Sequence, residues 1–170
     1  MNEHQIADFL KVIKGHKYEN MFLIALFTGM RQGEVCGLQW ECVDFDNGTI
    51  LIDKQLQSLR GKVRGDKEKY ALVPTKNGKE RTITAALYVM DLLWKTKQVQ
   101  DVNRKDFGSD FQENDLVFTD EIGSRVTPQA LYRAFKLVVA ELDMKDVRFH
   151  DLRHTFATIA LQNGVDIKTV

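Results

Sequence analysis

The sequence is poor in cysteine and proline, and each scarcity excludes a class of protein. Cys36 and Cys42 are the only cysteines among the 170 residues. They form neither a C-x-x-C pair nor a multi-cysteine framework, so we expect no structural zinc site and no disulfide scaffold. With only two prolines and no low-complexity tract, the chain also lacks the composition of a disordered protein. We interpret both cysteines as small buried or half-buried residues.

Long apolar runs are missing as well. The longest one, Met21–Phe27, is far too short to span a bilayer. The first fifteen residues include acidic side chains and mix polar with apolar ones, so they lack the basic start and apolar centre of a signal peptide. These absences predict a soluble, cytoplasmic protein that has no membrane partner.

An excess of charge of one sign is absent from the chain as a whole. The 24 basic residues balance the 24 acidic ones, which by itself argues poorly for a nucleic-acid-binding domain. The distribution is uneven, however, because the segment Arg60–Arg81 is strongly basic. Such a run is typical either of a solvated loop or of a surface that meets an anionic partner. The length and the 44% hydrophobic content predict one globular domain over residues 1–170.

Helical periodicity dominates the pattern of apolar residues. Glycine or a Thr-Gly pair follows two of the apolar segments, and Thr127-Pro128 has the form of a helix start. A polar loop through Asn114 and a short apolar segment, Leu116–Phe118, are expected between helices. The predicted helices are Ile6–Ile13, Glu19–Phe27, Met30–Leu38, Ala85–Val99, Pro128–Leu142 and His150–Gln162.

Strand patterns occupy the middle of the chain. Thr49–Ile52, Tyr70–Val73 and Arg81–Ile83 have the composition of strands. Asn77-Gly78 is a strong hairpin signal and predicts that the last two strands pair with each other. The sequence therefore predicts an α+β fold, mostly helical, with a small antiparallel three-stranded sheet.

The most informative segment for chemistry surrounds His150. On a helix, His150, Arg153 and His154 share one face and could converge on one anionic group. Two other interpretations compete. His150 and His154, with Asp151 between them, also have the spacing of a zinc-binding helix, although Arg153 disfavours a metal and no glutamate or histidine follows. Alternatively, these residues belong to an ordinary helix with partly buried histidines.

Three segments, in order, resemble the tyrosine recombinases of the phage integrase family. His150–His154 resembles the H-x-L-R-H motif, Thr28–Val35 resembles the T-G-x-R-x-x-E segment, and Pro74–Ile83 resembles the hairpin that carries the catalytic lysine. The ordered combination is more specific than any single motif, and the resemblance extends from Phe22 to Val170. It implies the catalytic domain of an integrase.

The resemblance also implies roles for individual residues. Arg31 and Arg153 would clamp the phosphate, because guanidinium groups stabilise the negative charge that develops during attack on a phosphodiester. Arg31 on its own could equally be a surface arginine. Lys76 would protonate the departing 5′ oxygen, with Lys79 as the alternative, and His150 would assist proton transfer. No metal and no cofactor are expected.

Further residues are expected to support this site or to contact DNA. In the family, the position of Glu34 supports the geometry of the site, and we interpret Asp151 and His154 in the same way. The basic residues around the lysine hairpin could contact phosphates of double-stranded DNA. These candidate DNA contacts are Lys62, Arg64, Lys79 and Arg81.

The attacking tyrosine of the family is not found at the expected place. The tyrosines are Tyr18, Tyr70, Tyr88 and Tyr132, and none follows the H-x-L-R-H segment. A further helix expected to begin at Asp166 is interrupted at Val170, which predicts a truncated domain without its nucleophile and without the amino-terminal DNA-binding domains of integrases. This chain should then be monomeric and unable to cleave DNA alone.

The resemblance implies partners as well. In the family, several protomers of the same recombinase assemble on double-stranded DNA at attachment sites, and we expect a bacterial cytoplasmic protein that joins the nucleoid when it binds DNA. The main alternative is a non-catalytic regulatory module that keeps the fold and binds DNA without cleaving it.

Overall fold

The computed structural model describes residues 1–59, 70–75 and 78–162, with the side chains of the last helix described as far as Phe156. The chain divides into two compact units. Unit 1 combines Met1–Gln32 with Gln129–Val170, and unit 2 is Gly33–Pro128. The expectation of one domain over the whole chain stays a prediction. No helix in the described ranges has the length and apolar character needed to cross a membrane.

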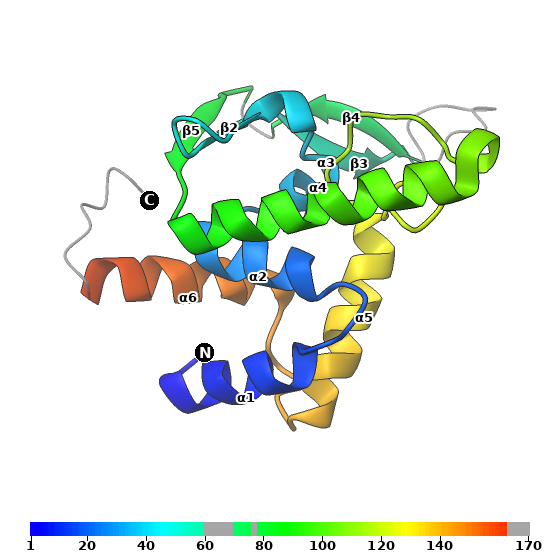
Figure 1. Cartoon of the computed structure of the whole chain (residues 1–170). Helices are drawn as coiled ribbons and strands as arrows, with labels where there is room; N and C mark the ends of the chain where they lie inside the picture. Colours follow the sequence, from blue (N-terminus) through cyan, green and yellow to red (C-terminus); the bar gives the residue numbers. More distant parts are fainter. Residues whose placement is uncertain (60–69, 76–77, 163–170) are drawn as a thin grey trace. The chain divides into compact units, whose positions relative to one another are not determined.

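The described part of unit 1 is built of helices (Figure 1). The first begins with a capping box, in which Asn2 and Gln5 each accept a hydrogen bond from the other's backbone N–H at 2.9 Å. The second is buried on nearly all sides, from Met21 to Leu26. All four agree with the predicted helices to within a few residues. They are α1 (Glu3–Ile13), α2 (Glu19–Thr28), α5 (Pro128–Glu141) and α6 (Phe149–Gln162).

A cluster of phenylalanines forms the centre of unit 1. Each of the four helices contributes one ring, and neighbouring ring centroids lie 5.4–6.4 Å apart in tilted or edge-to-face arrangements. All four side chains are buried. Because Phe149 is the first residue of α6, the cluster packs the start of this helix against the other helices. The four residues are Phe9, Phe22, Phe135 and Phe149.

Unit 2 contains two small antiparallel sheets. One has the order β1-β2-β5 and the other pairs β3 with β4. The predicted three-stranded sheet is present, but its membership differs, because β1 stands where the strand at Tyr70 was predicted. The strands are β1 (Val43–Asp44), β2 (Thr49–Ile52), β3 (Lys54–Ser58), β4 (Tyr70–Pro74) and β5 (Arg81–Thr84).

The hairpin predicted at Asn77-Gly78 is wrong in its pairing. β5 pairs with β2, from Ile52 opposite Arg81, and β4 pairs with β3, from Lys54 opposite Pro74. Asp53 alone connects β2 to β3 between these two ladders, whereas residues 75–80 connect β4 to β5. The N–H of Thr75 donates to the Asp53 carbonyl at 3.1 Å.

Helix α4 (Leu87–Phe107) is longer than the sequence predicts. The expected polar loop after Val99 begins only at Gly108, which has a positive φ of 50°. The polar residues continue the helix because their side chains make contacts that stabilise it or lie buried against its neighbours. The guanidinium of Arg104 contacts Asp101 at 2.6 Å, three residues before it, while Gln100 is buried with 5% exposure.

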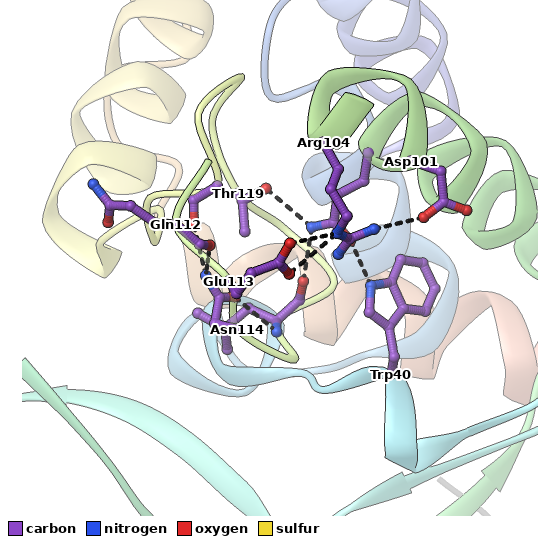
Figure 2. A network of polar contacts seen from close by, with 10 residues as sticks. Trp40, Asp101, Arg104, Gln112, Glu113, Asn114 and Thr119 are labelled. Atoms are coloured by element: carbon purple, nitrogen blue, oxygen red, sulfur yellow. Dashed lines mark hydrogen bonds and ion pairs between the residues drawn. The ribbon is translucent and has the colours of Figure 1, made fainter. Parts of the chain in front are cut away.

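Gln100 fixes α4 to two other segments of unit 2, within the polar network that Figure 2 shows around Trp40, Arg104 and Thr119. Its side-chain oxygen accepts from the indole N–H of Trp40 at 2.7 Å. Its amide donates to the Leu116 carbonyl and to the Thr119 hydroxyl, both at 3.0 Å. A buried amide with such partners keeps its neighbours in one arrangement, because separation would leave polar groups unpaired. The short helices of unit 2 are α3 (Gln32–Gly37), η1 (Trp40–Cys42) and η2 (Gly108–Asp110).

Candidate active site

The turn after α2 presents Arg31, the first of the two predicted clamp arginines. Gly29 caps α2 in the left-handed conformation, with φ 64°, and its N–H donates to the Ala25 carbonyl at 3.1 Å. The Thr28 hydroxyl donates to the Ile24 carbonyl and accepts from the Met30 N–H at 3.3 Å. Thr28 and Met30 are buried, so the turn is fixed on both sides of the glycine.

The start of α6 carries the predicted site residues His150, Asp151 and His154. The backbone N–H of Arg148, just before the helix, donates to the Asp151 carboxylate at 2.8 Å, and the guanidinium of Arg148 contacts the same carboxylate at 3.1 Å. His150 and His154 follow one another on the exposed side, with ring centroids 4.8 Å apart. This arrangement confirms that they share one face of the helix.

Arg153 connects α6 to the turn that carries Arg31. Its Nη1 donates to the carbonyl oxygen of Gly29 at 2.5 Å. One turn later, the ring of Phe156 lies so close to Gly29 that a Cβ at this position would be 2.7 Å from Cδ1 of the ring. The packing of α2 against α6 thus brings a residue of the T-G-x-R-x-x-E segment and a residue of the H-x-L-R-H motif together within unit 1.

The charges of this site act on His150. Burial first, and then the positive charges of His154, Arg153 and Arg31, lower the pKa of His150 below its usual value of 6.5. A lowered pKa leaves the imidazole neutral, and able to accept a proton, over more of the physiological pH range. The same cations would favour an anion placed among them.

Asp151 has a different partner from the one expected. Burial raises its pKa, but the hydrogen bonds from Arg148 outweigh burial and lower the pKa below the ordinary value. The carboxylate therefore stabilises the start of α6 by accepting hydrogen bonds from Arg148. Its predicted role in orienting the two arginines of the clamp stays a prediction, as does the same role for His154.

The predicted residues of unit 2 form a separate pair. Glu34 is buried with 1% exposure, and its two oxygens accept from Nη1 and Nη2 of Arg81 at 3.0 and 2.7 Å. Arg81, predicted as a DNA contact, thus holds a carboxylate with both arms of its guanidinium. The Lys79 side chain is exposed, and its carbonyl accepts from the Thr75 hydroxyl at 2.6 Å. Lys76, Lys62 and Arg64 lie outside the described residues.

Two contributors to the site were missed at the level of sequence. The T-G-x-R-x-x-E segment includes Gly29 but gives no role to its carbonyl, and the H-x-L-R-H motif ends before Phe156. The Gly29 carbonyl accepts from Arg153, and the ring of Phe156 lies close to where a Cβ of residue 29 would be, so both contacts join residues more than a hundred positions apart in sequence. The glycine two residues before the T-G-x-R arginine was the one available signal, since close backbone approach is a common reason for glycine.

The zinc interpretation receives no support from the described residues. Among them, no three histidine, cysteine, aspartate or glutamate side chains come together as a metal-binding group. Both cysteines are buried and free, and burial raises the pKa of Cys36 and raises that of Cys42 to about 11. Neither thiol has the character of a reactive nucleophile.

Comparison with known proteins gives one consistent family. The model of the phage integrase family matches residues 1–170. A tyrosine recombinase XerC-like protein of Caldanaerobacter subterraneus is 27% identical over 99% of this chain and 45% of its own length. The putative defective protein IntQ of Escherichia coli is 23% identical over 94% of this chain and 42% of its own length. The chain spans about half the length of the curated relatives it matches.

Solved structures share the fold. The Tn1549 transposon integrase, in complex with a circular intermediate DNA, matches with a TM-score of 0.79 at 22% identity, over 99% of this chain and 55% of that one. The lambda integrase catalytic core matches with a TM-score of 0.61 at 12% identity, over 94% of this chain and 85% of that one. The mostly helical fold with a small antiparallel sheet is therefore that of an integrase catalytic domain.

Proposed function

The chain belongs to the phage integrase family, and we propose that it supplies the phosphate-activating part of a tyrosine recombinase that carries out site-specific recombination of double-stranded DNA. The observation that carries this proposal is the contact of Arg153 with the turn of Arg31. Burial, and then the charges of His154, Arg153 and Arg31, lower the pKa of His150. A cationic site of this kind suits a phosphodiester whose non-bridging oxygens gain charge during attack.

The proposed reaction is a transesterification. A tyrosine oxygen forms a bond to the scissile phosphorus, giving a 3′-phosphotyrosyl link, while the bond to the 5′ oxygen breaks. Arg31 and Arg153 stabilise the charge on the phosphate, and His150 assists proton transfer. Lys76, with Lys79 as the alternative, delivers a proton to the departing 5′ oxygen. No metal and no cofactor take part in this scheme.

The attacking tyrosine is proposed to lie outside these 170 residues. The four tyrosines present all precede the H-x-L-R-H segment, so the chain alone should bind phosphate without cleaving DNA. We further propose that the partners are DNA and other protomers of the same recombinase, and that the chain by itself is a monomer. Basic residues near the lysine segment would add salt-dependent contacts to DNA phosphates.

Covalent adduct formation tests this function directly. The full gene product is incubated with nicked suicide duplexes drawn from the DNA around the gene, beside variants Arg153→Ala and Arg133→Ala. Arg133 is an exposed arginine of α5 and serves as the matched control. We expect an adduct that is slowed by about a hundredfold or more by Arg153→Ala and is retained by the control.

Two results would contradict the proposal. An adduct that forms equally fast with Arg153→Ala would remove the arginine from the mechanism. Binding of the duplexes without any adduct would leave the non-catalytic DNA-binding module as the better description.

A further inference from the structure

Gly29 makes two contacts with α6 that do not follow from the H-x-L-R-H motif. Its carbonyl accepts from Nη1 of Arg153, and its Cα faces the ring of Phe156. A Cβ at Gly29 would lie 2.7 Å from Cδ1, 3.3 Å from Cε1 and 3.4 Å from Cγ of that ring. The close approach involves the edge of the ring that carries Cδ1.

The two contacts come from one face of α6. Arg153 and Phe156 are three residues apart, so their side chains lie next to each other on the helix. Leu152 and Thr155, which flank them in sequence, are buried, and the Thr155 hydroxyl donates to the Asp151 carbonyl at 2.8 Å. The face that carries Arg153 and Phe156 is thus held against the turn by its neighbours.

The turn itself has little freedom to move. It is fixed by the cap of α2 and by the buried side chains on both sides of Gly29. Arg31 follows Gly29 by two residues, so any change in the distance between α6 and Gly29 also changes the spacing of the two arginines. Fixed donors act on a developing charge more strongly than donors that must first be ordered.

We propose that Gly29 and Phe156 are positioning residues of the phosphate clamp: the ring of Phe156 sets the distance of α6 from the turn, and the Gly29 carbonyl then orients the guanidinium of Arg153 relative to Arg31. The role of these two residues in catalysis rests on the proposed function. The geometry itself is a property of unit 1 and can be tested without any reaction.

The first test measures the order of Arg153 in this 170-residue chain by NMR. In the wild type, the bond to Gly29 should slow rotation of the guanidinium and give distinct Nη–H signals. Phe156→Leu should average these signals and raise the pKa of His150, because the charge of Arg153 no longer sits beside it. Phe156→Tyr keeps the ring and should restore both properties.

A matched variant separates positioning from loss of stability. Phe9→Leu removes a ring of the same kind from the core of unit 1, away from Gly29. It should lower the melting temperature but leave the Arg153 signals and the pKa of His150 unchanged. Wild-type Arg153 signals in Phe156→Leu, or equal disturbance in Phe9→Leu, would overturn the proposal.

The second test uses the full gene product at saturating DNA. Phe156→Leu should slow adduct formation by about tenfold or more while the DNA affinity stays within about twofold, since the clamp is misplaced and not removed. An unchanged rate would overturn the role in catalysis. If the wild type forms no adduct, the proposed function fails, whereas the NMR result on Arg153 still decides whether Phe156 positions it.

Discussion

The carboxylate of Glu34 holds both terminal nitrogens of Arg81, one oxygen to each, at 3.0 and 2.7 Å. The two partners differ in burial, because Glu34 has 1% of its side chain exposed and Arg81 has 29%. Such a bidentate pair fixes β5 to α3, since both hydrogen bonds must form in one plane. The difference in burial decides which partner is harder to remove.

We expect Arg81→Met to destabilise the chain more than Glu34→Gln does. The first change leaves a buried carboxylate without its cation and should cost about 3 kcal/mol. The second leaves a guanidinium that water can reach and should cost about 1–2 kcal/mol. Urea unfolding of the variants measures both values. Arg148→Met, at an exposed ion pair, is the control and should leave the free energy of unfolding nearly unchanged.

Gln100→Leu should cost about 2–3 kcal/mol, because it leaves the Trp40 indole N–H and the Leu116 carbonyl without their partner. The exposed residue Gln98 lies on the same helix and supplies the control, Gln98→Leu. Thermal or urea unfolding distinguishes the two. Equal small effects would mean that the network shown in Figure 2 contributes little to stability.

Gly29→Ala and Gly15→Ala separate backbone strain from steric conflict. Both glycines have positive φ, but a Cβ at Gly15 meets nothing within 4 Å, whereas one at Gly29 meets the ring of Phe156. Strain alone should cost about 1–2 kcal/mol at either position. The free energy of unfolding should fall further for Gly29→Ala, and a double variant with Phe156→Ala should recover part of that difference. Equal losses at both glycines would argue against a tight contact.

The lowered pKa of His150 predicts how stability depends on pH. The unfolded chain binds a proton at about 6.5, and the folded chain binds it only at lower pH, so this histidine favours folding above 6.5 and loses that contribution as the pH falls toward the folded pKa. His16 also has a lowered pKa, caused first by burial, and acts in the same direction. In phosphate-free buffer, His150→Gln should therefore lose less stability on acidification than the wild type.

Most helices of this fold could be predicted because their signals are local. Gly29 and Thr127-Pro128 mark helix ends within the sequence itself, and α2 is apolar throughout. The strands were harder, because β3 contains two glutamines and a lysine and resembles a loop. The Asn-Gly signal suggested a local hairpin, but strand pairing is decided by partners far away in sequence.

The site could be predicted only to the level of its motifs. The resemblance indicated Arg31, His150 and Arg153, and the structure brings these three together in unit 1. The partner of Arg81 and the role of the Gly29 carbonyl depend on contacts across 47 and 124 residues of sequence. No local pattern encodes such contacts, because they arise only when the helices and strands pack.

Residues 75–80 connect β4, which pairs with β3, to β5, which pairs with β2. Pairing on one side of Asp53 does not determine the register on the other side. An insertion or deletion between Pro74 and Arg81 would therefore leave both ladders in register, whereas the same change inside a strand would turn its side chains to the opposite face. A change in the length of the chain between these two residues would accordingly not require the sheets beside it to be rebuilt.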